Sequence, residues 1–186
     1  MRNTLRLILI LILGSWLSQA ASGLRFIEED LSFELCDSVF SVSGIYYFMS
    51  AEEKEYPILY PFPEDSAYSR PYDISVLNMR TGKEMGYSFQ AISGHLFFTL
   101  RVSGETPVRI DYKQRLYAKH ARYILLSTRS WGQPLKIADL SLKIPPDITI
   151  TDFSLPPDKE IMLEGQRLYL WQKRNFIPDC DFIIRF

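Results

Sequence analysis

The sequence predicts an all-β sandwich of roughly ten short antiparallel strands. Most segments from Leu24 onward alternate apolar and polar residues with a period of two, short Pro- and Gly-containing turns separate them, and no segment has the period of a long helix. Hydrophobic residues make up 47% of the 186 residues, which suffices for a sizeable core and argues against disorder. We expect a single β-sandwich domain over residues 21–186. A split near residues 114–120 into two small β units is the alternative.

The first twenty residues have the features of a secretory signal peptide. Arg2 and Arg6 form a positive start, residues 7–17 are apolar, and Ser18-Gln19-Ala20 fits a cleavage site. Eleven helical residues rise only about 16 Å, well short of a bilayer core of about 30 Å. We therefore expect a signal helix over residues 1–20 and an exported protein, either periplasmic or secreted. Contact with a membrane is expected only if this segment stays uncleaved as an anchor.

Alternation in the N-terminal third predicts strands at residues 31–35 and 40–48. Gly44 interrupts the apolar row of the second strand, which indicates a bulge or a close backbone approach. A charged turn at residues 51–55 leads into residues 56–63, where three prolines remove ladder donors, so this segment should be an edge strand or an extended arm. The residues on the polar faces of the first two strands are Ser32, Glu34, Ser41 and Ser43.

Two hairpins are expected in the middle of the chain, after a polar loop at residues 64–73. The first joins strands at 74–79 and 85–90 around Thr81-Gly82-Lys83, and the second joins 96–102 and 108–112 through a turn at 103–106.

The longest apolar run outside the leader lies within residues 122–131. An unbroken run with polar ends fits a strand buried on both faces, and Gly132 and Pro134 argue against a helix. We expect this segment to be the central strand. The remaining predicted strands are at residues 140–144, 148–150, 161–163, 168–171 and 182–184.

Cys36 and Cys180 lie near the two ends of the mature chain. In an oxidising compartment an even count permits a disulfide, and the strands that carry the termini are often neighbours in a sandwich. Two unpaired thiols that act as small apolar residues are the alternative. Without CxxC spacing, and with only two histidines, the sequence predicts no metal site.

Several short motifs resemble an uncharacterised family of exported bacterial proteins. They are the strand over residues 40–48 followed by Tyr60-Pro61-Phe62-Pro63, the run Tyr123-Ile124-Leu125-Leu126-Ser127-Thr128 with Trp131 and Pro134, the strand end Ile144-Pro145, and Asn175-Phe176-Ile177-Pro178. The resemblance spans nearly all of the mature chain. It implies an immunoglobulin-like sandwich outside the cytoplasm, and it carries over no functional residue.

Charge and residue types restrict the function. Removing Arg2 and Arg6 leaves 19 basic and 22 acidic residues, a net charge of −3, which argues against a nucleic-acid binder. No Gly-x-Ser-x-Gly elbow is present, and nothing singles out His95 or His120 as a catalytic base. We therefore predict no catalytic residue and no cofactor.

Four aromatic residues, Phe62, Tyr68, Tyr72 and Tyr87, lie in or near the Pro-rich segment and the loop after it. Such rings can stack on sugars or anchor a protein partner, although capping one end of the core is the simpler interpretation. We treat them as the candidate interaction surface. The leading hypothesis is an exported, non-enzymatic interaction or structural module of the bacterial envelope, with a protein or glycan partner. The alternatives are a hydrolase-type enzyme, or a carbohydrate-binding module that uses these loop aromatics.

Overall fold

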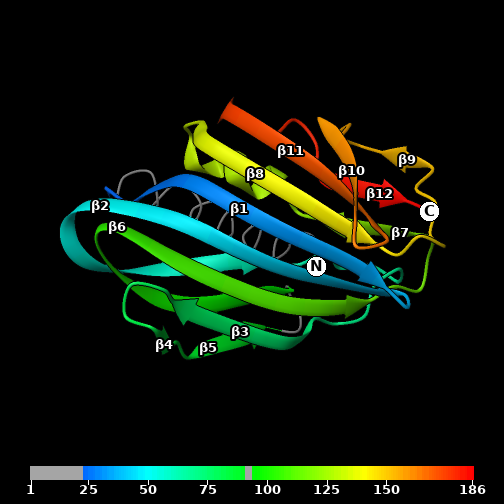
Figure 1. The fold of residues 1–186 in the computed structure, drawn as a ribbon. Helices are drawn as coiled ribbons and strands as arrows, with labels where there is room; N and C mark the ends of the chain where they lie inside the picture. The colour runs from blue at the N-terminus through cyan, green and yellow to red at the C-terminus, as the bar shows by residue number, and fades with distance from the viewer. Residues whose placement is uncertain (1–22, 91–93) are drawn as a thin grey trace, which may run out of the picture.

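The computed structural model describes residues 23–90 and 94–186, and it shows an all-β protein (Figure 1). The strands are β1 (Arg25–Cys36), β2 (Val39–Pro61), β3 (Tyr72–Asn78), β4 (Lys83–Glu84), β5 (Tyr87–Gln90), β6 (His95–Arg115), β7 (His120–Tyr123), β8 (Leu135–Ile144), β9 (Asp152–Phe153), β10 (Lys159–Leu163), β11 (Gln166–Phe176) and β12 (Phe182–Arg185). A 3-10 helix, η1 (Leu126–Trp131), lies between β7 and β8. The predicted signal helix lies outside the described residues. No helix within them is long and apolar enough to cross a membrane.

Nine strands form one large mixed sheet in the order β10-β11-β8-β1-β2-β6-β3-β4, with β5 also paired to β6. The expected antiparallel arrangement is wrong at one pair, because β1 and β8 run parallel. Parallel neighbours need a long crossover. Here the connection contains β2 to β6 of the same sheet, then β7 of the small sheet and η1, before the chain returns beside β1.

The two longest strands, β2 and β6, bend together and contribute to both sides of the core. They have 23 and 21 residues and pair antiparallel from Val39 opposite Arg115 to Pro61 opposite His95. The register is interrupted only between Ser50 and Lys54, where both strands turn back at the left of Figure 1. The predicted turns at 51–55 and 103–106 are therefore two halves of one bend. They do not end separate strands, because the pairing continues on both sides of the bend.

The second half of β2 pairs only with β6 within the described residues, so the predicted edge strand at residues 56–63 is confirmed up to Pro61, where β2 ends. The three prolines of this segment leave its outer edge with few donors for a further strand.

The apolar residues of alternate positions face one contiguous core. Trp171, Tyr112, Phe40 and Phe182 are among the largest fully buried side chains. The rings of Phe33 on β1 and Phe182 on β12 stack with centroids 4.7 Å apart, so the first and last strands face each other across the core.

The predicted central strand at residues 122–131 is wrong. Residues His120–Tyr123 form the short edge strand β7 of a three-stranded sheet, and Leu126–Trp131 form η1. Only alternate residues of the apolar run are buried: Tyr123 and Leu125 are 5% and 1% exposed, whereas Leu126 is 37% exposed. A short apolar run does not distinguish a strand buried on both faces from an edge strand followed by a helical turn.

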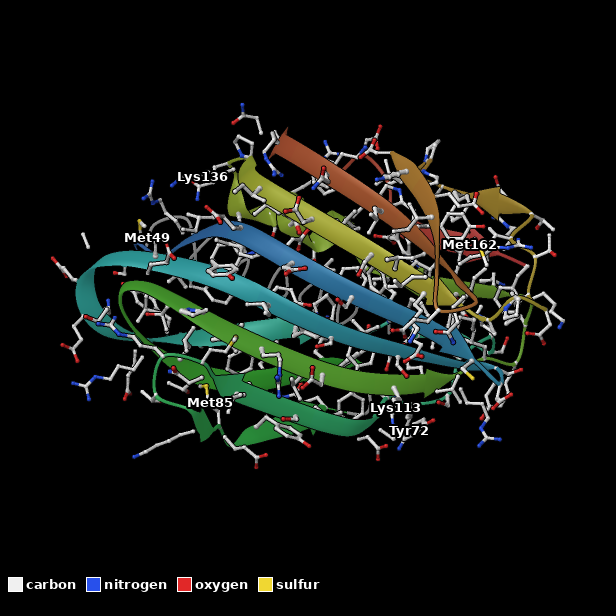
Figure 2. The ribbon with its side chains drawn as sticks, viewed as in Figure 1. Met49, Tyr72, Met85, Lys113, Lys136 and Met162 are labelled. Atoms are coloured by element: carbon white, nitrogen blue, oxygen red, sulfur yellow. The ribbon has the colours of Figure 1, made fainter. Side chains whose placement is uncertain are left out.

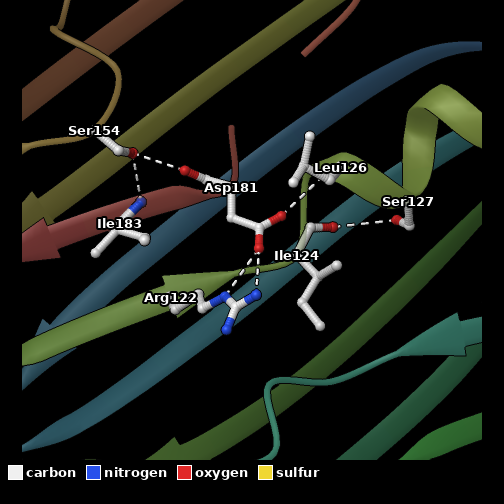
Figure 3. A network of polar contacts seen from close by, with 7 residues as sticks. All are labelled: Arg122, Ile124, Leu126, Ser127, Ser154, Asp181 and Ile183. Atoms are coloured by element: carbon white, nitrogen blue, oxygen red, sulfur yellow. Dashed lines mark hydrogen bonds and ion pairs between the residues drawn. The ribbon is translucent and has the colours of Figure 1, made fainter. Parts of the chain in front are cut away.

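The small sheet has the order β7-β12-β9 and is held together by a polar network around Asp181 (Figure 3). The Arg122 guanidinium donates two hydrogen bonds to the buried Asp181 carboxylate, at 2.6 and 2.9 Å, and the Leu126 N–H donates a third at 3.0 Å. Ser154 donates to the Asp181 carbonyl and accepts from the Ile183 N–H. These bonds fix the start of η1 to both strands.

Candidate functional site

The outer face of the large sheet carries a row of small hydroxyl side chains on neighbouring strands. Ser32 on β1 lies opposite Ser43 of β2 on one side and Ser141 of β8 on the other, and Ser43 lies opposite Asp111 of β6. The Ser141 hydroxyl donates to Ser32 Oγ at 3.2 Å, and Ser43 donates to Asp111 Oδ1 at 2.6 Å. The apolar residues between these positions point into the core, so each strand contributes its polar alternate positions to this face.

The next row of the same face contains longer side chains. It crosses six strands in register: Leu168 on β11, Lys143 on β8, Glu34 on β1, Ser41 on β2, Lys113 on β6 and Tyr72 on β3. We call the outward residues Ser32, Glu34, Ser41, Ser43, Asp111, Lys113, Ser141 and Lys143 the serine face.

Short side chains in the middle of the serine face and longer ones around them leave a hollow of about 380 Å³. Its floor is formed by the serines, and its rim includes Lys113, Lys143, Asp73 and Leu168. Figure 2 shows Lys113 with Tyr72 beside it, at one end of the second row. Pockets for small molecules begin at about this size, so a ligand can be seated here and contacted by several strands.

Each carboxylate in the hollow has a cationic partner. Lys113 Nζ lies 3.1 Å from Asp73, Arg109 Nε lies 3.0 Å from Asp111, and Lys143 Nζ lies 3.9 Å from Glu34. These pairs are largely exposed, so they add little to the free energy of folding. Their effect is local, because they neutralise the charge around the serines.

The structure divides the four predicted surface aromatics into two groups. Phe62 and Tyr68 are 3% and 7% exposed and belong to the core, so they are not surface residues. The Phe62 ring packs against Tyr112 with centroids 4.8 Å apart. The interpretation that such rings cap the core is correct for these two residues, because the β2–β3 connection folds over the end of the bent strands.

Tyr72 and Tyr87 are exposed, at 37% and 43%, but they lie on different surfaces. Tyr72 stands beside Lys113 at the end of the serine face. Tyr87 lines a second hollow of about 620 Å³ together with Pro57, Met85 and Phe97, and its hydroxyl donates to the Ile74 carbonyl. The four aromatics therefore form no common surface.

The two cysteines are both free thiols, so the predicted disulfide is not formed. Cys36 is exposed at the end of β1, and like Ser32 and Glu34 it points away from the core. Cys180 belongs to the other layer, next to β12, and its thiol contacts the Ser154 carbonyl at 3.7 Å. Facing sheets lie about 10 Å apart, beyond the Cα separation of about 7 Å that a disulfide tolerates. The terminal strands face each other across the core instead of pairing edge to edge, an arrangement that agrees with the alternative of two unpaired thiols.

The inner face of β1 and β2 contains a second polar group. Tyr46 bonds to the hydroxyls of Tyr60 and Tyr123 at 2.8 and 2.9 Å, entirely within the core. Glu29 is 2% exposed, and burial raises the pKa of its carboxyl from the usual 4.5 to about 8. Burial likewise raises the pKa of Tyr46 well above its usual value. These groups are closed to ligands.

Other candidate groups do not converge on the serine face. His95 lies on β6 and His120 on β7, and neither lines the hollow. Within residues 23–90 and 94–186, no group of three or more His, Cys, Asp or Glu side chains is placed to hold a metal ion.

The sequence analysis identified the alternation that turns Ser32, Glu34, Ser41 and Ser43 to one side, but it did not identify them as a site. The missing signal was Ser141, whose position beside Ser32 depends on the parallel pairing of β1 and β8. Serines at the polar positions of several predicted strands are the pattern that would have indicated this face.

Comparisons with known proteins show a likeness of fold. No family model matches the chain, and no curated protein matches it. The fold is similar to the crystal structure of a "putative nutrient binding protein" from Legionella pneumophila subsp. pneumophila str. Philadelphia 1, with a TM-score of 0.63 and 14% identity over 87% of this chain. The chain covers 66% of that protein, slightly under two thirds of its length. At this identity the likeness shows the fold alone.

Proposed function

We propose that the protein is an exported, non-enzymatic binding module that holds its ligand on the serine face. In this proposal residues 1–20 direct export and residues 21–186 form one immunoglobulin-like sandwich of the exported bacterial family that the sequence resembles. The observation that carries the proposal is the hollow of about 380 Å³, in which three strands present serine hydroxyls beside paired charges.

The composition of the hollow favours binding over hydrolysis. It contains serines and carboxylates, but the residues that line it include no histidine to activate a serine. The carboxylates Asp111 and Asp73 are engaged by Arg109 and Lys113. Groups arranged in this way can hold a ligand by several hydrogen bonds without reacting with it. The fold likeness to a protein named for nutrient binding is in keeping with this proposal.

Retention of envelope material on the immobilised protein tests the proposal. The full chain, purified as its host processes it, is compared with Ser141→Tyr, which fills the floor of the hollow, and with Thr99→Tyr. Thr99 is exposed on β6 at the second hollow and serves as the matched control. We expect the wild type and Thr99→Tyr to retain the same material in unmodified form and Ser141→Tyr to lose it. Equal retention by all three proteins would contradict a role for the serine face. Loss of the retained material in Thr99→Tyr alone would indicate that the ligand binds at the surface around Tyr87 instead.

A further inference from the structure

We infer that the ligand of the serine face is a neutral, extended saccharide, an inference that rests on the proposed binding function. Three properties of the face lead to this class of ligand: its mixture of donors and acceptors, its balanced charge, and its length across the strands.

The hydrogen-bonding groups match those of a sugar. A serine hydroxyl donates one hydrogen bond and accepts others, a carboxylate accepts, and an ammonium donates. Ser32, Ser43 and Ser141 lie in one row, with Ser41 between Glu34 and Lys113 in the next. Sugar hydroxyls also both donate and accept. A ligand covered with hydroxyls can therefore satisfy every one of these groups, whereas an apolar ligand would leave them desolvated and unpaired.

The charges argue for a neutral ligand. The three carboxylates Glu34, Asp73 and Asp111 are matched one to one by Lys143, Lys113 and Arg109. An anionic ligand such as a phosphorylated or sulfated chain would have to displace carboxylates from these cations, and it gains nothing from a balanced surface. A cationic ligand would have to displace the lysines and the arginine from the carboxylates, and it gains equally little.

The shape of the site favours a chain over a single ring. The row from Leu168 to Tyr72 crosses six strands, and five strand spacings of about 4.8 Å give a length of about 24 Å. Its two ends are apolar or aromatic, with the half-buried Leu168 at one end and the 37% exposed Tyr72 at the other. Tyr72 offers a ring against which the C–H face of a sugar can pack. Polar groups in the middle and apolar contacts at the ends suit an oligosaccharide of several units lying across the strands.

The inference is tested with a printed array of neutral and acidic glycans, probed with the full chain and followed by calorimetry on the glycans that bind. We expect binding to neutral glycans that changes little between low and high salt, because no net charge is exchanged. Ser43→Ala removes one hydroxyl and should weaken the affinity about three- to tenfold, the effect of one lost hydrogen bond. Ser141→Tyr should abolish binding, and Thr99→Tyr should bind as the wild type does. Circular dichroism establishes whether each variant is folded. If Ser141→Tyr does not fold, the smaller substitution Ser43→Ala still tests the inference.

The outcomes separate this inference from the proposed function. Binding to acidic glycans alone, with loss at high salt, would overturn the neutral-saccharide inference. The saccharide inference would also be overturned if no glycan is bound while envelope protein is retained by the wild type and lost in Ser141→Tyr. That result would leave the proposed binding function in place. Absence of both glycan binding and retention would overturn both.

Discussion

The two faces of the large sheet use similar polar groups for opposite purposes. On the outer face, Ser32, Ser43 and Ser141 line an open hollow with charged neighbours. On the inner face of the same strands, Glu29 and Tyr46 are enclosed in the core, and Oε1 of Glu29 has no hydrogen-bond partner in the described part of the chain. A polar group at the surface exchanges one partner for another, whereas a buried one must be satisfied internally or lowers the stability. Polar residues on the outer face can therefore be replaced with little effect on folding, whereas those on the inner face are constrained by the core.

The largest difference in stability is expected between substitutions of two adjacent residues of β11, one on each face of the sheet. Trp171 is fully buried and its indole donates to the Leu155 carbonyl at 2.9 Å, while Gln172 points outward. Trp171→Ala should lower the free energy of unfolding by about 3–5 kcal/mol, and Gln172→Ala by less than about 0.5 kcal/mol. Denaturant unfolding of both variants measures the difference. Similar losses in the two variants would contradict the assignment of the two faces.

The next effect concerns the buried carboxyl. The pKa of Glu29 is raised by burial from 4.5 to about 8, so between these values the folded chain keeps a proton that the unfolded chain has lost. The contribution of Glu29 to stability should therefore be greatest below about pH 4.5, fall as the pH rises toward 8, and level off above it. Glu29→Gln removes this loss and should stabilise the protein by several kcal/mol at pH 8 but little at pH 4.

Thermal melts of this variant at pH 4, 6 and 8 test that prediction, with Glu34→Gln on the exposed face as the matched control. Tyr46 and Tyr60 do not complicate the comparison, because burial raises the pKa of both hydroxyls well above their usual value. If Glu29→Gln melts in parallel with the wild type at all three pH values, the carboxyl is not buried as described.

A smaller effect is expected where a glycine makes room for the tyrosine network. Gly44 keeps regular register with Leu31, so a bulge is not found at this residue, and the group that comes close to it is the side chain of Tyr46. The ring of Tyr46 lies directly over Gly44, and a methyl group there would collide with it. Gly44→Ala should displace the hydroxyl from Tyr60 and Tyr123 and lower the stability by about 1–3 kcal/mol. Gly86→Ala, in open space, is the control for denaturant unfolding.

On the outer face, removal of a hydroxyl should hardly affect folding. Ser43 donates to Asp111 at 2.6 Å, but it is only half-buried and water can replace it as a partner. Ser43→Ala should change the free energy of unfolding by less than about 1 kcal/mol, whereas the proposed binding function predicts a weaker affinity for the ligand. A larger loss measured by denaturant unfolding would show that the serine face also contributes to stability.

The smallest effect on stability is expected from reduction of the protein, because the two thiols lie in different layers and are not bonded to each other. Cys36 belongs to the outer face and Cys180 to the opposite layer. Thiol titration of the unfolded, unreduced protein should find two free thiols per chain, and a reductant should leave the melting temperature unchanged. Finding no free thiol would restore the disulfide and contradict the separation of the layers.

The residues that face outward along each strand could be predicted from the sequence alone. Period-two alternation is a local property, so Ser32 and Glu34 could be assigned to one side of β1, and Ser41 and Ser43 to one side of β2, without knowledge of the partner strands. The prolines of residues 56–61 likewise excluded a central strand, because the missing N–H donor is a property of the residue itself.

Which of these strands lie side by side could be seen only in the folded structure. The parallel pairing of β1 and β8 brings Ser141 next to Ser32 across more than a hundred residues, and the shared bend of β2 and β6 makes two strands from four predicted ones. It also placed the apolar run after Arg122 at a strand edge and in η1, because the Asp181 carboxylate holds that turn by hydrogen bonds from Arg122 and the Leu126 N–H. Alternation marks the face of a strand but carries no information on its partner, since many pairings bury the same apolar residues and the choice among them depends on contacts between distant segments.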